Sequence, residues 1–169
     1  MPYDPGIYNL KRPIGVKILV PIQVLLSAIS IPSGALLLLK PGGESLGAQS
    51  ILPYLTERIP FVQDFGIVGM FLLIVYGFLP IIFAFGLWTQ KKWAWALTLL
   101  LGLVEIAWIT TEVILFYNLG FFIFYPIIAG MGVATAALCL LHSVRRFYFG
   151  AHTTEKIGIE SVAKQETIA

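Results

Sequence analysis

Residues 93–117, WAWALTLLLGLVEIAWITTEVILFY, decide the fold class of this chain. At a rise of about 1.5 Å per residue, a helix over this apolar run crosses the roughly 30 Å hydrocarbon core of a bilayer. Two carboxylates interrupt the run, and Glu105 and Glu112 lie on one helix face, about 10 Å apart along the axis. An ionised side chain at the middle of a membrane costs at least about 2.5 kcal/mol, so it is rare unless it faces protein or water. The face that carries both glutamates is therefore the first place to look for function.

Composition places the whole chain in the same class. The 169 residues are 58% hydrophobic and 12% charged, whereas soluble domains carry about 25% charged residues. We expect an integral membrane protein with an all-α fold. The predicted spans, each long enough to cross a bilayer, are about 15–39, 67–88, 93–117 and 121–142. They predict a four-helix transmembrane bundle as a single domain, 1–150, followed by a polar cytoplasmic tail, 151–169.

Basic residues predict the orientation. Two of the eleven cations, Lys40 and Arg58, fall between the first and second spans. The other nine fall on the opposite side: Lys11, Arg12, Lys17, Lys91, Lys92, Arg145, Arg146, Lys156 and Lys164. Because cytoplasmic loops carry the excess of Lys and Arg, we expect a multi-pass plasma-membrane protein with both termini cytoplasmic. The net charge of +2 is small, and the cations flank the predicted spans instead of forming one basic cluster. No nucleic-acid partner is therefore expected.

The connections between the spans are unequal. Residues 89–92 and 118–120 are short enough to make the second, third and fourth helices antiparallel neighbours. The segment 40–66 is longer and contains apolar residues at 51, 52, 55 and 59, which form a short helical stripe. We expect an amphipathic segment that lies on the outer membrane face or over the mouth of the bundle. A plain solvated loop is the alternative, because Pro53 and Pro60 break any longer helix.

Small residues at helical spacing predict how the helices pack. Hydrophobic burial gives little driving force between helices in lipid, so close backbone approach through small side chains takes its place. The predicted packing residues are Gly34, Gly102, Gly132 and Ala136. Such faces favour one compact bundle, or a bundle joined by a partner helix.

Polar residues at a similar depth predict a group around the first glutamate. Ser27 and Glu105 both lie about twelve residues from the inner boundary of their helices, and Tyr76 reaches a similar level. The predicted intramembrane polar or interface residues are Gln23, Ser27, Tyr76, Glu105 and Glu112. Either the glutamates relay protons, bind a cation or receive a basic group, or Glu105 is a protonated carboxyl that is hydrogen-bonded to a neighbouring helix. The structural role is favoured, since no Lys or Arg near the middle of a span could pair with them.

Other chemistry-bearing residues are sparse. Cys139 and His142 are spaced i, i+3, and with His152 they form a weak candidate for a metal site. One sulfur and two imidazoles in the whole chain fit chance placement better, so no metal and no cofactor is predicted. A single cysteine also excludes an internal disulfide and a CxxC redox centre. Phosphate-binding loops, nucleophile elbows and HExxH are absent from the sequence, so we expect a non-catalytic chain.

Boundary motifs resemble a known family. They are Arg12-Pro13-Ile14-Gly15-Val16 before the first span, Gly86-Leu87-Trp88 with Lys92-Trp93-Ala94-Trp95 across the inner hairpin, and Val144-Arg145-Arg146-Phe147-Tyr148-Phe149-Gly150 after the fourth span. Over most of residues 11–150 the chain resembles an uncharacterised family of small four-helix integral membrane proteins of archaea and bacteria. The resemblance implies the four-helix fold and no particular activity, and the two glutamates are not part of the family's pattern.

Three functional hypotheses follow. The first is a non-catalytic accessory or stabilising subunit of a larger membrane complex, such as an archaeal respiratory oxidase or copper membrane monooxygenase, with other transmembrane subunits and the lipid bilayer as partners. The second is a small proton- or cation-coupled transporter or channel that uses Glu105 and Glu112. It is similar in size to the small multidrug carriers, although their essential glutamate lies in the first helix, where this chain has none. The third, a membrane enzyme acting on lipid or quinone, has no residues to support it. The sequence favours the first hypothesis.

Overall fold

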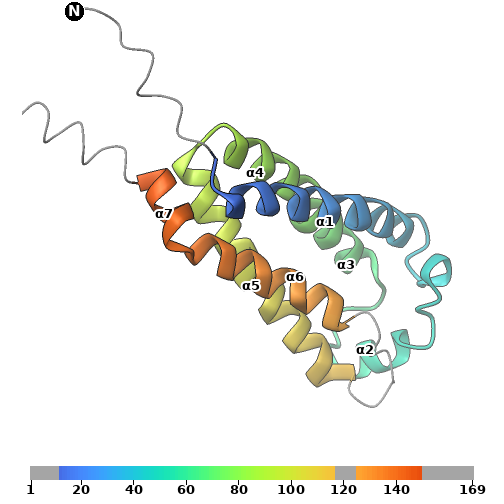
Figure 1. Ribbon diagram of the computed structural model, residues 1–169. Helices are drawn as coiled ribbons and strands as arrows, with labels where there is room; N and C mark the ends of the chain where they lie inside the picture. The colour runs from blue at the N-terminus through green and yellow to red at the C-terminus, as the bar shows by residue number, and fades with distance from the viewer. Residues whose placement is uncertain (1–11, 117–124, 150–169) are drawn as a thin grey trace, which may run out of the picture.

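The computed structural model describes residues 12–116 and 125–149 (Figure 1). Within these residues the chain is helical, without a strand, so the all-α prediction is confirmed. A fourth candidate span is counted if the bent pair Pro126–Leu140 and His142–Phe149 is one span. The three other stretches that are long and apolar enough to cross a membrane are Ile14–Leu39, Gly66–Trp88 and Lys92–Leu115. The chain therefore has the helices of a membrane protein.

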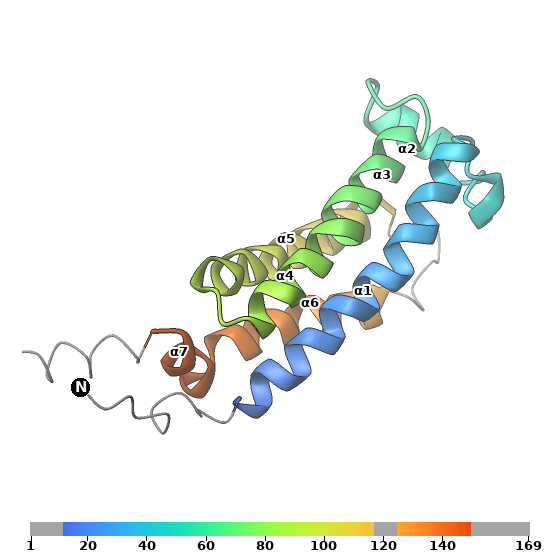
Figure 2. The same ribbon diagram turned by 90° about the horizontal axis from the view of Figure 1, so that it is seen from above.

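The first two long stretches pack along each other as a pair. Helix α1 (Ile14–Leu39) runs beside a rod that consists of α3 (Gly66–Phe71), the π-helical segment η3 (Leu72–Phe78) and α4 (Leu79–Trp88) (Figure 2). A Cβ atom on Gly34 would lie 2.7 Å from the carbonyl oxygen of Gly69. The two backbones approach this closely because neither residue has a side chain to separate them.

The π-helical segment η3 has a local cause. Pro80 has no backbone N–H, and in an α-helix its ring clashes with the carbonyl of Tyr76, four residues earlier. A wider turn relieves the clash, and η3 ends directly before the turn that contains the proline. The sequence predicts one span over 67–88, and the structure widens the helix in the middle of this range. Since π-helical turns occur frequently at functional sites, η3 marks this level of the bundle for attention.

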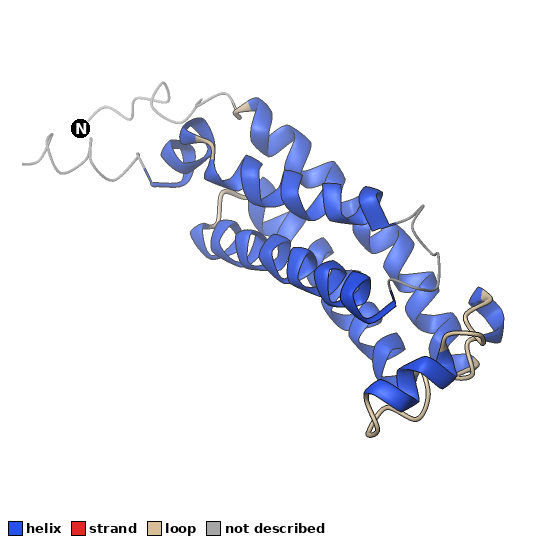
Figure 3. Cartoon of the chain, turned by 90° about the horizontal axis from the view of Figure 1, so that it is seen from below, coloured by secondary structure: helices blue, strands red, loops and turns tan. Residues whose placement is uncertain are grey.

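The second pair consists of α5 (Lys92–Phe116) and α6 (Tyr125–Leu140). A Cβ atom on Gly102 would lie 3.1 Å from the carbonyl oxygen of Gly132, and one on Gly132 would lie 3.2 Å from that of Gly102. The two pairs join where α4 packs on α5 and where α1 packs on α6 (Figures 1 and 3). Both pairs thus hold their helices together through glycine contacts between backbones.

The fourth span ends earlier than expected and continues in a new direction. The sequence predicts one helix over 121–142, of which 121–124 lie outside the described residues. In the structure α6 ends at Leu140, and α7 (His142–Phe149) is bent by 57° against it. The bend buries Val144 and Tyr148 and leaves Arg145 and Arg146 exposed. The turn is explained by the amphipathic sequence of α7, whose apolar side packs on the bundle while its cations reach water.

The two ends of the molecule are named after their short helices. The α7 end contains the start of α1, the turn between α4 and α5, and α7 itself, whereas the α2 end contains η2 (Glu44–Leu46) and α2 (Leu52–Arg58) (Figure 2). At the α2 end, Leu55 is buried with Leu37, Val62 and Phe65, and Ile51, Leu52 and Ile59 pack around them. The segment between α1 and α3 therefore covers the ends of these helices with the apolar stripe at 51, 52, 55 and 59.

Exposed cations are distributed unequally between the two ends. Lys40 and Arg58 are exposed at the α2 end. Those exposed at the α7 end are Lys17, Lys91, Lys92, Arg145 and Arg146. This is the asymmetry from which a cytoplasmic α7 end is predicted, and the orientation itself stays a prediction.

Candidate intramembrane carboxylate site

Polar side chains are buried in the middle of the bundle, where α1, η3, α5 and α6 meet. Each of them exposes at most 3% of its surface: Gln23, Ser27, Tyr76, Thr98, Glu105 and Thr135. Gln23 Nε2 donates a hydrogen bond to Thr135 Oγ1 at 3.4 Å, which links α1 to α6. Ser30, one turn above Ser27, is also buried. The helices therefore enclose a polar layer at the depth where a membrane is most apolar.

Most of this layer has no hydrogen-bond partner among the described residues. The atoms without one are Gln23 Oε1, Ser27 Oγ, Tyr76 Oη, Thr98 Oγ1 and both carboxylate oxygens of Glu105. A buried polar group that lacks a partner costs about 1–3 kcal/mol, and a charged one costs more. Native proteins contain few such groups, and each one calls for a proton, an ion, a water or a ligand to complete it. Six such atoms, from five residues, belong to this group of buried polar side chains.

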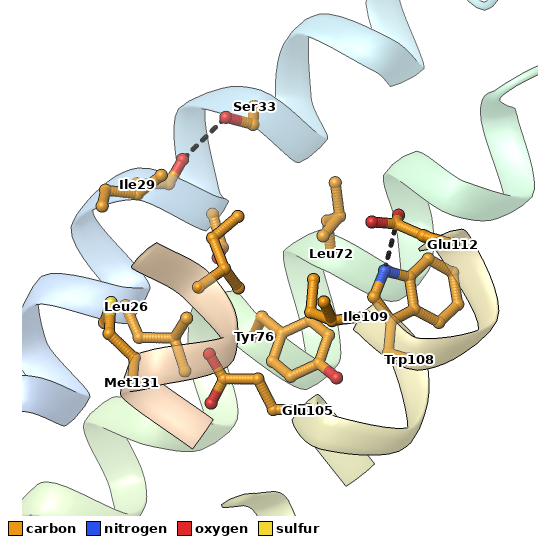
Figure 4. A pocket seen from close by; sticks show the side chains of 12 residues that line it. Leu26, Ile29, Ser33, Leu72, Tyr76, Glu105, Trp108, Ile109, Glu112 and Met131 are labelled. Carbon is orange, nitrogen blue, oxygen red and sulfur yellow. Dashed lines mark hydrogen bonds between the residues drawn. The ribbon is translucent and has the colours of Figure 1, made fainter. Parts of the chain in front are cut away.

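A cavity of about 200 Å³ lies beside this layer, in the α2 half of the bundle (Figure 4). Its polar lining comes from Ser30, Ser33, Tyr76, Glu105 and Glu112. Its apolar lining comes from Leu26, Ile29, Leu72, Trp108, Ile109, Ile128 and Met131. A water molecule occupies roughly 30 Å³ in the liquid, so the cavity has room for about six waters. It is smaller than pockets for drug-sized ligands, which measure about 300–1,000 Å³.

Glu105 reaches this cavity because α6 has a glycine opposite it. A Cβ atom on Gly132 would lie 3.2 Å from both Cβ and Cγ of Glu105, so any side chain there would push the glutamate aside. The stem of Glu105 thus packs on the α6 backbone. Figure 4 shows its carboxylate between Met131 and the ring of Tyr76. Since the cavity lining contains no Lys or Arg, the carboxylate meets no fixed positive charge there.

Glu112, two turns further along α5, has different surroundings. The indole nitrogen of Trp108 donates a hydrogen bond to Glu112 Oε1 at 2.8 Å (Figure 4). Trp108 stacks on Phe71 of α3, with ring centroids 4.6 Å apart, and Phe71 meets the edge of Tyr76 at 5.4 Å. This aromatic row holds the indole in place. Glu112 is therefore positioned by a donor, whereas Glu105 is not.

The structure places the predicted polar residues unevenly. Tyr76, Glu105 and Glu112 line the same cavity, whereas Gln23 and Ser27 are buried and are not among its lining residues. Sequence reasoning missed Trp108, which supplies the donor for Glu112. Its spacing contained a signal, because residues i and i+4 of a helix are neighbours and Trp108 precedes Glu112 by four.

The remaining predicted residues lie elsewhere. Gly34 packs on α3, while Gly102, Gly132 and Ala136 lie between α5 and α6. Cys139 is fully buried in an apolar cluster, and His142 is exposed beside Arg145 and Arg146. His152 lies outside the described residues. Within residues 12–116 and 125–149 the structure forms no group of three or more His, Cys, Asp or Glu side chains that could hold a metal ion.

No family model, no curated protein and no solved structure matches this chain. The resemblance of the boundary motifs to a family of small four-helix membrane proteins therefore stays a prediction. The function has to be argued from the geometry of the site.

Proposed function

We propose that this protein is a small proton- or cation-coupled transporter that crosses the plasma membrane four times as a four-helix bundle, with both termini cytoplasmic. Glu105 is the residue that binds the transported proton or cation. The proposal takes α6 and α7 together as the fourth pass, with α7 in the cytoplasmic interface, where its exposed arginines meet water and lipid headgroups.

One observation carries the transport role, namely the state of Glu105. Its side chain is 1% exposed, both carboxylate oxygens lack a partner among the described residues, and it lines a cavity. A carboxylate only accepts hydrogen bonds, so it needs a proton or a donor to be stable in this place. Ionisable residues inside membranes that face a cavity mark ion and proton pathways in many proteins.

The same geometry weakens the argument for a purely structural role. A structural carboxyl would be hydrogen-bonded to a neighbouring helix, yet Ser27 and Tyr76, the expected partners, have no bond to it. The glycine faces that favoured an accessory subunit are also occupied, because Gly34 and Gly102 pack against helices of this same chain. Both observations support the second hypothesis over the first.

A transporter has to expose Glu105 to the two sides of the membrane in turn. The cavity lies in the α2 half, while the α7 half is closed by an apolar cluster. Its members that have no exposed surface are Val16, Leu19, Leu87, Ala94, Cys139 and Val144. A transport cycle would have to open this cluster to the cytoplasm while it closes the cavity.

Flux through the purified chain tests the proposal. Proteoliposomes that contain only this protein and an internal pH-sensitive dye receive an inside-negative potassium diffusion potential. We expect proton uptake that Glu105→Gln abolishes, since glutamine keeps the size but does not titrate. Glu57→Gln, on the exposed side of α2, serves as the matched control and should leave uptake unchanged. Uptake equal to that of protein-free vesicles would remove the proton-coupled function.

Labelling tests the orientation separately. The single native cysteine is buried, so a cysteine introduced at exposed Gln49 or exposed Lys91 is the only accessible thiol among the described residues. We expect a membrane-impermeant maleimide to label position 49 on intact cells, and position 91 only after the cells are permeabilised. The reverse pattern would invert the proposed topology.

A second candidate, the accessory subunit of a larger complex, is favoured by one outward face. Gly130 of α6 has open space where a Cβ atom would be, and Ala134 and Ala137 follow it at helical spacing. Small residues on a lipid-facing side suit contact with another transmembrane helix. Gly130→Leu should then release copurifying membrane proteins in mild detergent without unfolding the chain. If the wild-type protein copurifies with no other subunit, this candidate fails.

A further inference from the structure

A second cavity of about 260 Å³ lies on the other side of Trp108, under the segment that carries α2. Leu55 and Phe65 of this segment, Val68 of α3 and Leu115 of α5 contribute to its apolar wall. Its polar groups are few, because the hydroxyl of Thr111 is already bonded to the carbonyl oxygen of Ala107 at 2.9 Å. What remains is the Trp108–Glu112 pair. This cavity can therefore hold the hydrocarbon part of a ligand, and it offers one carboxylate to the ligand's polar group.

The two cavities share a wall. Trp108 and Glu112 line both of them, and no other residue does. The hydrogen bond between their side chains therefore stands at the boundary between an apolar chamber near the α2 end and the chamber that contains Glu105. We call the second cavity the outer chamber and the Trp108–Glu112 pair the divider. Phe71 lines the outer chamber and stacks on Trp108, and this stacking fixes the plane of the indole ring.

We propose that the outer chamber and Glu112 bind a small hydrophobic organic amine in its ammonium form, with the nitrogen on the Glu112 carboxylate and the hydrocarbon body in the chamber. This inference rests on the proposed function in one respect, that the species bound is a cation. It names the class of substrate that reaches Glu105, and it assigns to Trp108 the role of positioning Glu112.

Three properties of the lining select this class. Neither cavity has a Lys or Arg in its wall, so anions find no partner. The walls of the outer chamber are almost entirely apolar, which does not replace the water shell of an inorganic ion. Glu112 has lone pairs left after it accepts the indole N–H, and an ammonium donates to a carboxylate with a charge-assisted hydrogen bond.

Size selects within the class. At about 260 Å³ the chamber is below the roughly 300–1,000 Å³ of drug-sized pockets. We therefore expect a short alkyl or single-ring amine, and not a multiring cation. Each methylene added to a short chain should tighten binding up to about fourfold until the chamber is full.

Calorimetric titration of the purified full chain in detergent micelles tests the inference with hexylammonium as the probe. Hexanol has the same alkyl chain without the charge, hexanoate has the opposite charge, and methylammonium has the ammonium group without the long alkyl chain. We expect saturable binding of hexylammonium, at least tenfold tighter than that of each of the other three. Equal binding of hexanol would mean that the chamber takes lipid chains, and no saturable binding of hexylammonium would overturn the inference as well.

Variants locate the binding. Glu112→Gln should weaken hexylammonium binding at least tenfold and leave hexanol unchanged. Thr111→Trp fills the chamber from its exposed rim and should also abolish binding, whereas Thr110→Trp, on an exposed neighbour that lines neither cavity, is the matched control. If Glu112→Gln does not fold, the Thr111 and Thr110 pair decides alone, and unchanged binding in Thr111→Trp contradicts the inference.

Binding and flux separate this inference from the proposed function. Proton uptake that depends on Glu105, together with no hexylammonium binding, would keep the transporter and remove the amine site. Hexylammonium binding without any flux would keep the site and remove the transporter.

Discussion

The α7 half and the α2 half of the bundle use their aromatic donors differently. In the α7 half, the hydroxyl of Tyr148 donates to the Leu87 carbonyl at 2.8 Å, and the indole of Trp95 donates to the Cys139 carbonyl at 2.9 Å. In the α2 half, the indole of Trp108 donates to a carboxylate, and the Tyr76 hydroxyl has no partner among the described residues. The aromatic donors of the α7 half thus bond to backbone carbonyls, while Tyr76, Trp108 and Glu112 of the α2 half line cavities.

The difference indicates where the chain is built for stability and where for binding. Carbonyls near helix ends need donors, and Tyr148 and Trp95 supply them while their rings fill the apolar cluster. Buried oxygens without partners lower the stability of a protein. Evolution keeps such atoms where a functional site needs them. Matched substitutions should therefore change the free energy of unfolding by different amounts in the two halves, and with opposite signs at groups that have and groups that lack a hydrogen-bond partner.

The largest expected effect comes from added volume. A Cβ atom on Gly86, at the α7 end, would lie 2.5 Å from Cβ of Ala94, so Gly86→Leu should cost about 3 kcal/mol of unfolding free energy or prevent folding. Ser33→Leu, which adds volume beside the cavity of the α2 half, should cost less than about 1 kcal/mol. Thermal unfolding in detergent measures both. Equal losses would show that the halves are packed alike.

An intermediate effect is expected from the glutamates. Glu105→Leu removes two oxygens that lack partners, so it should raise the unfolding free energy by about 1–3 kcal/mol while it abolishes flux. Glu112→Leu takes the acceptor away from the Trp108 indole and should lower the unfolding free energy. Denaturant unfolding followed by circular dichroism gives the two signs. A loss of stability in Glu105→Leu would mean that the carboxylate is bonded within the protein.

The smallest effect separates two tyrosines. Tyr148→Phe removes a hydrogen bond from a buried carbonyl and should cost about 0.5–1.5 kcal/mol. Tyr76→Phe removes a hydroxyl without a partner, so its unfolding free energy should stay the same or rise slightly. The same unfolding measurement applies to both variants. If Tyr76→Phe is the more destabilised of the two, the hydroxyl of Tyr76 has a partner after all.

The sequence predicted the features that depend on residues close together in the chain, namely helix positions and helix faces. The run of apolar residues from Trp93 onward, and the Pro and Gly residues that precede and follow the first span, predict helices that begin one residue after α1 and α5 do in the structure. The predicted end of the first span is that of α1, and the predicted end of the third, at 117, lies outside the described residues. Length and hydropathy carry that information because a helix that crosses lipid satisfies its own backbone. The face shared by Glu105 and Glu112 follows from helical periodicity in the same way, and both residues line one cavity.

What could not be predicted depends on contacts between distant segments. The bend before α7 requires that Val144 and Tyr148 find the start of α1 and the end of α4, which no local pattern reports. The divider at Trp108 needs Phe71 from another helix to hold its ring. The surroundings of Glu105 depend on how η3, α5 and α6 pack around it, and neither carboxylate oxygen has a hydrogen-bond partner among the described residues. The structural role of this carboxyl stays a prediction.

The π-helical segment η3 also determines how the chain responds to the deletion of one residue. A π turn takes up one residue more than an α turn, and one residue corresponds to about 100° of rotation in an α-helix. The wider turn absorbs that rotation, so deleting a single codon within 72–78 should leave an ordinary α turn and keep α3 in phase with α4. Gly69 would then keep its place on the Gly34 backbone, in a contact that admits no Cβ atom. Loss of one residue from this short stretch should thus leave the two packing surfaces of the rod aligned.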